Sequence, residues 1–217
     1  MPSEVTPIRL GAANAFLLRG PSGYIVVDTG APGGAGRILE VRTTRGLAPE
    51  GLRLILITHG HIDHFGSAAE LREKTGAPIA VHQEDAVALR QGVHAPGSLN
   101  PTSWPVALGM RLFGSLWPPV PGLEPDVLFA GEQRLDEYGI AGRVVPVPGH
   151  TLGSVAVVLD SGAALVGDLA IDLLGGRRPG KPIVAWDLAV NQESRARLAA
   201  LRPHPIYSGH GGPFASL

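Results

Sequence analysis

The chain has 217 residues, a formal net charge of −1 and 44% hydrophobic residues. This apolar content excludes a disordered chain, and the absence of cysteine excludes a disulfide scaffold and a cysteine-based zinc finger. A net charge near zero provides no long-range attraction to nucleic acid or to an anionic membrane, so we expect neither as a partner. Composition does not explain the eight histidines.

The N-terminal half of the chain alternates short apolar runs with segments of helical spacing. Residues 10–18 and 24–28 predict two strands joined by a Gly-Pro-Ser-Gly turn, which is typical of a hairpin. Residues 52–58, with the sequence LRLILIT, predict a strand that is buried on both faces. The pattern also predicts helices over 35–45, 66–74 and 84–91, and a strand over 78–82.

The C-terminal half repeats this alternation. It predicts strands over 143–147, 154–160, 163–167 and 206–207, and an amphipathic helix over 187–201 with Asp187 as its N-cap. Strands alternate with helices and hairpins also occur, so we expect the α/β (α+β) class, with a mixed sheet and helices outside it. No linker divides the sequence, and we expect residues 1–217 to form a single domain.

The predicted strand over 52–58 is followed by a dense cluster of potential metal ligands, namely His59, His61, Asp63 and His64. Proteins of this class place their sites at the ends of buried strands. Packing several imidazoles together without a metal would cost desolvation and mutual repulsion. Two imidazoles two residues apart on a turn can converge on one ion, and Asp63 and His64 are displaced toward a second ion.

Three further candidate ligands, His150, Asp168 and His210, each follow a strand-like segment later in the chain. Each is preceded by a glycine, which lets the backbone turn tightly beside a ligand. The three remaining histidines, His82, His94 and His204, stand alone, and we interpret them as ordinary loop residues.

The order and context of these motifs resemble the metallo-β-lactamase fold superfamily. The resemblance runs from Asp28-Thr29-Gly30 through the cluster at 59–64 and Pro148-Gly149-His150-Thr151 to Gly209-His210-Gly211. It implies a four-layer αββα sandwich, in which two mixed sheets pack face to face between helices. It also implies that His59, His61 and His150 bind a first metal, that Asp63, His64 and His210 bind a second, and that Asp168 bridges both.

The resemblance implies a hydrolase with two divalent metal ions as cofactors. Zinc is the ion that we expect, with iron or manganese as alternatives, because imidazole and carboxylate suit all three. Hydroxide held between the ions would attack a small-molecule substrate, and Asp63 would act as the catalytic residue that orients the hydroxide or passes a proton to the leaving group.

With Asp168 at the bridging position, the chain resembles the glyoxalase II and lactonase branch of the superfamily. We therefore expect an ester, thioester or lactone as substrate. Glyoxalase II carries a C-terminal helical extension, whereas this sequence ends seven residues after His210, and residues 169–172 lack the tyrosine of acyl-homoserine lactonases. Two alternatives remain open. One is a phosphodiesterase, for which Arg177, Arg178 and Lys181 could meet an anionic substrate. The other is a mononuclear iron persulfide dioxygenase that uses His59, His150 and Asp168.

Residues 93–125 form an apolar segment whose role the sequence leaves open. They contain a predicted helix over 103–116 and many apolar side chains, including Leu99, Trp104, Val106, Leu108, Met110, Leu112, Phe113 and Trp117. This helical insert could cover the edge of the core, act as a lid over the metal site, or form the contact of a homodimer. The N-terminus shows no signal peptide, so we expect a cytoplasmic protein.

Overall fold

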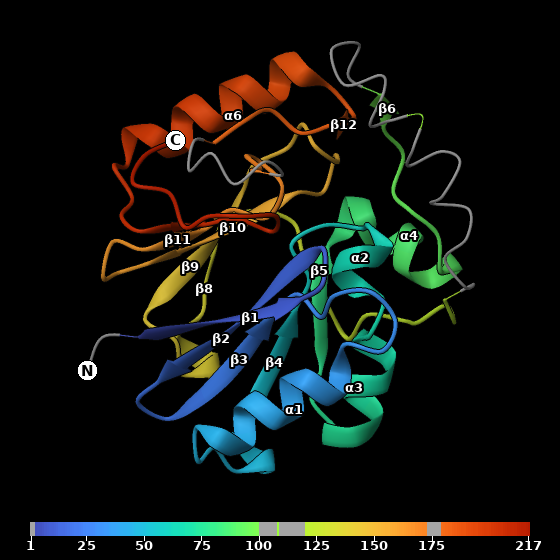
Figure 1. The fold of residues 1–217 in the computed structure, drawn as a ribbon, viewed down its shortest axis with the longest axis vertical. Helices are drawn as coiled ribbons and strands as arrows, with labels where there is room; N and C mark the ends of the chain where they lie inside the picture. The colour runs from blue at the N-terminus through green and yellow to red at the C-terminus, as the bar shows by residue number, and fades with distance from the viewer. Residues whose placement is uncertain (1–2, 100–107, 109–119, 173–178) are drawn as a thin grey trace.

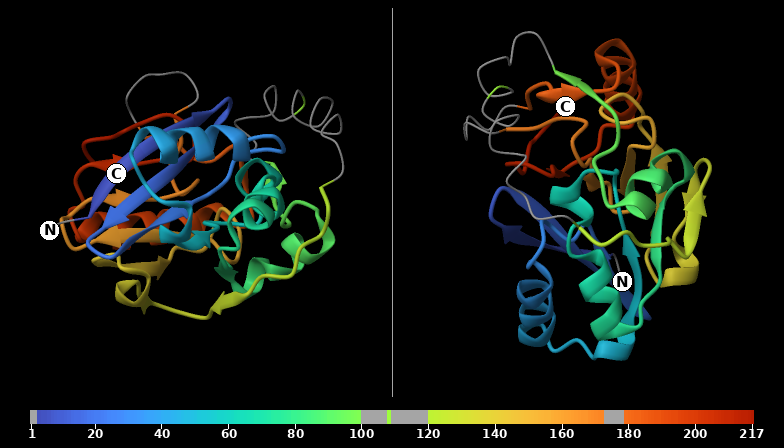
Figure 2. Two further views of the ribbon diagram at one scale, coloured as in Figure 1. Left: turned by 90° about the horizontal axis from the view of Figure 1, so that it is seen from below. Right: turned by 90° about the vertical axis from the view of Figure 1, so that its right-hand side faces the viewer.

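The computed structural model of the chain describes residues 3–99, 108, 120–172 and 179–217. Two β-sheets pack against each other, with helices on their outer sides (Figures 1 and 2). Among the described residues, no helix is both long and apolar enough to cross a membrane.

The first sheet has six strands. Its order is β1 (Glu4–Leu10), β2 (Ala13–Gly20), β3 (Gly23–Val27), β4 (Leu52–Leu56), β5 (Ile79–His82) and β7 (Val127–Phe129). The pairs β1–β2 and β2–β3 are antiparallel, whereas β3, β4, β5 and β7 run parallel to one another. The segments that follow β3, β4 and β5 therefore leave the sheet at the same edge.

The second sheet has five strands. Its order is β13 (Ile206–Tyr207), β11 (Ala164–Leu165), β10 (Val155–Leu159), β9 (Gly142–Pro146) and β8 (Gln133–Arg134). Because β10 is antiparallel to both β9 and β11, and β11 is parallel to β13, the strands β9, β11 and β13 all point the same way. A separate antiparallel pair joins β6 (Ser98–Leu99) to β12 (Val184–Ala185).

Helices cover the outer face of each sheet. The described helices are α1 (Ala35–Thr44), α2 (Ile62–Phe65), α3 (Ala68–Thr75), α4 (Ala86–Gln91) and α6 (Leu188–Ala200), with short 3₁₀ turns η1 (Pro49–Gly51), η2 (Gln83–Asp85) and η5 (Asp136–Tyr138). Helices α1 and α3 lie on the first sheet, and α6 lies on the second (Figure 1). Asp187 caps α6 as predicted, because its carboxylate accepts the N–H groups of Ala189 and Val190.

Three apolar clusters hold these layers together. One lies between the first sheet and its helices and includes Ile55 and Phe65. The second lies between the two sheets and includes Phe129 and Val157. The third packs Leu198 of α6 against the second sheet. The order helix, sheet, sheet, helix confirms the predicted αββα sandwich.

The sequence did not predict strand β1. The predicted strand over 10–18 is observed as β2, and Leu10 instead ends β1. β1 contains Pro7, which cannot donate a backbone hydrogen bond and therefore argues against a strand when read locally. In the fold, β1 is an edge strand, where this missing donor is tolerated.

The apolar segment 93–125 is described in part. The predicted helix over 103–116 lies outside the described residues, apart from Leu108. At the end of the segment, Val120 and Leu123 are buried in the cluster beneath the first sheet, and the Leu123 N–H donates to Leu89 O at 2.9 Å. This part of the segment therefore covers the edge of the core.

The burial of β7 gives a stability prediction. Replacing Phe129, which is fully buried between the sheets, with alanine should lower the free energy of unfolding by about 3–5 kcal/mol through lost burial and a residual cavity. Its neighbour Leu128 is 45% exposed, so Leu128→Ala should change the free energy by less than about 0.5 kcal/mol. Urea unfolding measures both, and equal effects would contradict the assigned faces of β7.

Candidate metal site

The predicted ligand side chains gather where the strands of both sheets end. His59 and His61 lie in the loop after β4, and Asp63 and His64 lie on α2. His150, Asp168 and His210 follow β9, β11 and β13, which all point the same way. The imidazoles and Asp168 are buried, and Asp63 is partly exposed. The structure therefore brings together all of the side chains that the sequence singled out.

Three imidazoles form one group. Ligand atoms of His59, His61 and His150 all lie within 4.8 Å of one another, and His150 Nε2 lies 3.0 Å from His61 Nδ1. Burial, followed by the charge of neighbouring imidazoles, holds the pKa of His59 and of His61 well below the ordinary histidine value. Burial also lowers the pKa of His150. These rings are therefore neutral near pH 7, which is the form that binds a metal.

Asp63, His64 and His210 form a second group. His210 Nε2 lies 3.3 Å from Asp63 Oδ2 and 3.3 Å from His64 Nε2. Burial lowers the pKa of His64, but Asp168 and Asp28 outweigh it and raise the pKa to about 9. In the same way, Asp168 and Asp63 overcome burial and raise the pKa of His210 to about 11. The neighbouring carboxylates thus stabilise the protonated, positively charged form of His64 and His210.

Asp168 lies between the two groups. Its Oδ1 is 3.5 Å from His64 Nε2, and its Oδ2 is 3.6 Å from His150 Nε2 and 3.2 Å from His210 Nε2. Burial raises the pKa of Asp168, but His210 and His64 outweigh burial and bring it well below the ordinary value. Asp168 is therefore a carboxylate in contact with imidazoles of both groups.

Two atoms at the centre of the cluster show that these residues fit a metal. His59 Nε2 and Asp168 Oδ1 are buried and have no hydrogen-bond partner among the described residues. A buried polar atom without a partner is costly unless an ion or a water occupies the adjacent space. Imidazole nitrogens and carboxylate oxygens are the donors that zinc, iron and manganese accept. The donor set therefore suits divalent cations.

Hydrogen bonds orient the imidazoles for this purpose. His150 Nδ1–H donates to Val184 O and His210 Nδ1–H donates to Ala12 O, each at 2.7 Å. Such bonds fix a proton on Nδ1, so Nε2 is the ring nitrogen that can bind a metal. Gly209 allows Asp168 and His64 to lie against the backbone beside His210, because a Cβ there would overlap Asp168 Oδ1 and a carbon of the His64 ring.

Asp28 orients the imidazoles of His59 and His64, which follow β4, through its hydrogen bonds. Its carboxylate accepts Thr58 N–H, Thr58 Oγ1–H and His64 Nδ1–H, each at 2.8 Å. Thr58 Oγ1 in turn accepts His59 Nδ1–H at 3.0 Å. Asp28 adopts φ 58°, a conformation that non-glycine residues rarely adopt. The sequence marked Asp28 as part of a motif, but its contacts required the folded chain.

His94 also lies beside the cluster, although its isolation in the sequence suggested an ordinary loop residue. Its Nδ1 accepts Ile62 N–H at 3.3 Å, and its ring centroid is 5.4 Å from that of His61. His94, His61 and Asp63 offer ligand atoms within 4.8 Å of one another. No short spacing links His94 to the cluster, so the sequence held no signal for this contact.

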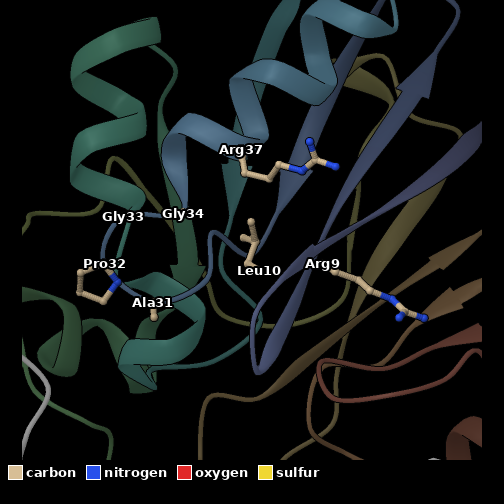
Figure 3. Close-up of a pocket in the computed structure, with 7 residues that line it drawn as sticks. All are labelled: Arg9, Leu10, Ala31, Pro32, Gly33, Gly34 and Arg37. Atoms are coloured by element: carbon tan, nitrogen blue, oxygen red, sulfur yellow. The ribbon is translucent and has the colours of Figure 1, made fainter.

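The structure also has a surface pocket that none of the candidate metal ligands lines. It has a volume of about 260 Å³ and lies where β1 meets the start of α1 (Figure 3). Its lining comprises Arg9, Leu10, Ala31, Pro32, Gly33, Gly34 and Arg37. Arg37 is exposed and pairs with Glu40 at 2.6 Å. The imidazole and carboxylate cluster, not this pocket, is therefore the candidate site.

Several known proteins are similar to this chain over most of its length. The chain is 30% identical over 210 residues to mouse metallo-beta-lactamase domain-containing protein 1, and the alignment covers 97% of this chain and 68% of the relative. It is 29% identical to the probable metallo-hydrolase YflN of Bacillus subtilis strain 168, covering 93% and 81% of the two chains. A hydroxyacylglutathione hydrolase of Anaeromyxobacter dehalogenans is 32% identical, covering 74% of this chain and 47% of the relative.

Solved structures share the fold. The metallo-beta-lactamase family protein TTHA1429 from Thermus thermophilus superposes with a TM-score of 0.70 at 25% identity, covering 99% of this chain and 75% of the other. TTHA1623, solved in a di-iron-bound form, superposes with a TM-score of 0.66 at 27% identity, covering 95% and 92%. The sequence profile of the Metallo-beta-lactamase superfamily matches residues 8–210. The chain therefore belongs to the metallo-beta-lactamase superfamily.

Proposed function

We propose that the chain is a hydrolase that binds two divalent metal ions and cleaves an ester, a thioester or a lactone. The observation that carries this proposal is the position of Asp168, whose carboxylate lies within 3.6 Å of imidazole nitrogens from both ligand groups. A carboxylate placed in this way can be shared by two ions. Membership of the superfamily supports hydrolysis as the reaction class.

We assign each ion to one of the observed groups. His59, His61 and His150 would hold one ion, Asp63, His64 and His210 the other, and Asp168 would contact both. When bound, the ions would supply a water activated for attack near neutral pH and positive charge that polarises the scissile carbonyl. Zinc is the ion we propose first, and iron is the alternative because TTHA1623 was solved with two irons.

Asp63 is the ligand side chain best placed to contact the substrate. Its side chain is 21% exposed, compared with 11% for His210 and 7% for Asp168. Burial raises the pKa of Asp63, but His64 and His210 outweigh burial and hold it well below the usual aspartate value. An ionised Asp63 can accept a proton from the attacking water and pass it to the leaving group, which is the role of a general base and acid.

Apolar side chains beside His150 favour an acyl substrate. Trp186 is 44% exposed, and its backbone N–H donates to the backbone carbonyl of His150 at 2.8 Å. Leu152, two residues after His150, is 41% exposed. These side chains suit the apolar part of a small ester or thioester better than a nucleic acid. Lys181 is exposed, whereas Arg177 and Arg178 lie outside the described residues.

Removing a ligand should remove both metal and activity. His150→Ala should lower the metal content per chain and reduce kcat/KM for a thioester or lactone by roughly 100-fold or more. His204→Ala is the matched control, because His204 is exposed and makes a long hydrogen bond to Ala215 O at 3.3 Å. Metal analysis and an ester, thioester and lactone panel test this, and full activity of chelator-treated protein would contradict the proposal.

Metal uptake should also release protons. His64 and His210 have pKa values of about 9 and about 11, so both are protonated at pH 7 and must lose a proton before their Nε2 can bind a metal. Affinity should therefore rise with pH up to about 9, where His64 loses its proton, and continue to rise toward about 11, where His210 loses its proton. Calorimetry in buffers of different ionisation enthalpy counts the protons, and His210→Ala should release fewer. Uptake without proton release would contradict the ligand assignment.

The apolar surface beside His150 should affect substrate choice. Trp186→Ala should raise KM for a long-chain acyl ester about tenfold more than for an acetyl ester, because the long chain loses apolar contact. Leu201→Ala is the control, since Leu201 is similarly exposed, at 49%, but lies at the far end of α6. Steady-state kinetics with both esters tests the prediction, and an equal change in the two KM values would oppose it.

A further inference from the structure

Asp85 is a buried carboxylate outside the two ligand groups. It ends η2, directly after β5, and is 2% exposed. Its Oδ2 accepts Gly60 N–H at 2.7 Å and Thr151 Oγ1–H at 2.6 Å, and its Oδ1 accepts Gly153 N–H at 2.9 Å. Gly60 lies in the loop after β4, whereas Thr151 and Gly153 lie in the loop after β9. One carboxylate therefore joins the ligand loops of two different sheets.

The sheet order explains how Asp85 reaches both loops. Strand β4 lies between β3 and β5, so the loop after β4 has Asp28 on one side and Asp85 on the other. Asp28 contacts the ring nitrogen of His64 directly. Asp85 instead binds the peptide N–H between His59 and His61, and the hydroxyl of the residue after His150. The contacts of Asp85 thus fall beside all members of the three-imidazole group.

The contacts of Asp85 are close and leave little freedom. A Cβ on Gly153 would lie 2.6 Å from Asp85 Cγ, and a Cβ on Gly60 would lie 3.2 Å from Asp85 Cβ. The first distance is shorter than real Cβ contacts, so Gly153 is required for its approach to Asp85, and the second is tighter than most such contacts. Hydrogen bonds to a buried carboxylate are about twice as strong as neutral ones. This arrangement fixes the distance between the two loops.

We propose that Asp85 is a positioning residue that holds the loop bearing His59 and His61 against the loop bearing His150, so that the three imidazoles converge on one cation. This inference rests on the proposed metal-dependent function. Among the described residues, the side-chain hydrogen bonds of Asp85 all go to these two loops. Loss of Asp85 should therefore weaken the three-imidazole group and spare the group of Asp63, His64 and His210.

The test introduces Asp85→Asn into two backgrounds, each of which keeps one group intact. His210→Ala retains the three-imidazole group, and His150→Ala retains the other. Competition with a chromophoric chelator measures the Zn²⁺ dissociation constant, and the Co²⁺ absorption spectrum reports the ligand environment. Asp85→Asn should weaken Zn²⁺ binding about tenfold in the His210→Ala background, because an amide N–H₂ replaces an acceptor that faces a donor. In the His150→Ala background the change should stay below about twofold.

Two further variants separate positioning from general destabilisation. Thr151→Val removes one of the three hydrogen bonds and keeps the carboxylate, so it should cause a smaller loss in the same background. Asp126→Asn is the matched control, because Asp126 accepts Ile79 N–H at 2.8 Å at the opposite end of β5. It should leave both Zn²⁺ constants unchanged. Thermal unfolding of each metal-free variant checks that it folds.

The outcomes distinguish this inference from the proposed function. Equal weakening by Asp85→Asn in both backgrounds, or no weakening in the His210→Ala background, would overturn the positioning role while leaving metal binding intact. If the wild-type chain binds neither Zn²⁺ nor Co²⁺, the proposed function itself fails. Selective weakening with an altered Co²⁺ spectrum supports Asp85 as the residue that sets the three-imidazole geometry.

Discussion

The arrangement of this protein depends on the concentration of imidazoles and carboxylates at one edge of two packed sheets. Burial and mutual repulsion oppose the protonation of His59, His61 and His150, while Asp168 and its neighbours favour positive charge on His64 and His210. The two groups therefore differ in electrostatic character although they share Asp168. A cation between them would satisfy the unpaired atoms, so the candidate chemistry follows from the cost of burying these side chains.

The fold meets this cost with hydrogen bonds from outside the ligand set. Strands that point the same way bring their following loops to one edge, and the sandwich brings the loops of the second sheet beside those of the first. Asp28 and Asp85 then hold the loop after β4 from both sides. Backbone carbonyls of Val184 and Ala12 orient the remaining imidazoles. Ligand direction is thus set by neighbours that need not bind a metal themselves.

Much of the fold and of the site follows from local sequence pattern. The apolar run over 52–58 predicts a buried strand because its residues suit an environment that is apolar on both faces. The spacing of His59, His61, Asp63 and His64 indicates metal chemistry because few other roles need such a density of ligands. The strands before His150, Asp168 and His210 are recognisable from their apolar residues. The order of all these motifs indicated the superfamily.

The sequence by itself determined which side chains are candidate ligands and which predicted strands they follow. The tertiary structure alone decided which residues support them. β1 exists because an edge position tolerates Pro7, and His94 meets His61 although no short spacing connects them. Asp28 and Asp85 act through hydrogen bonds to residues about 25 to 70 positions away, beyond any local period. Local patterns record burial and chain direction, whereas the partners of a buried carboxylate depend on which strands become neighbours.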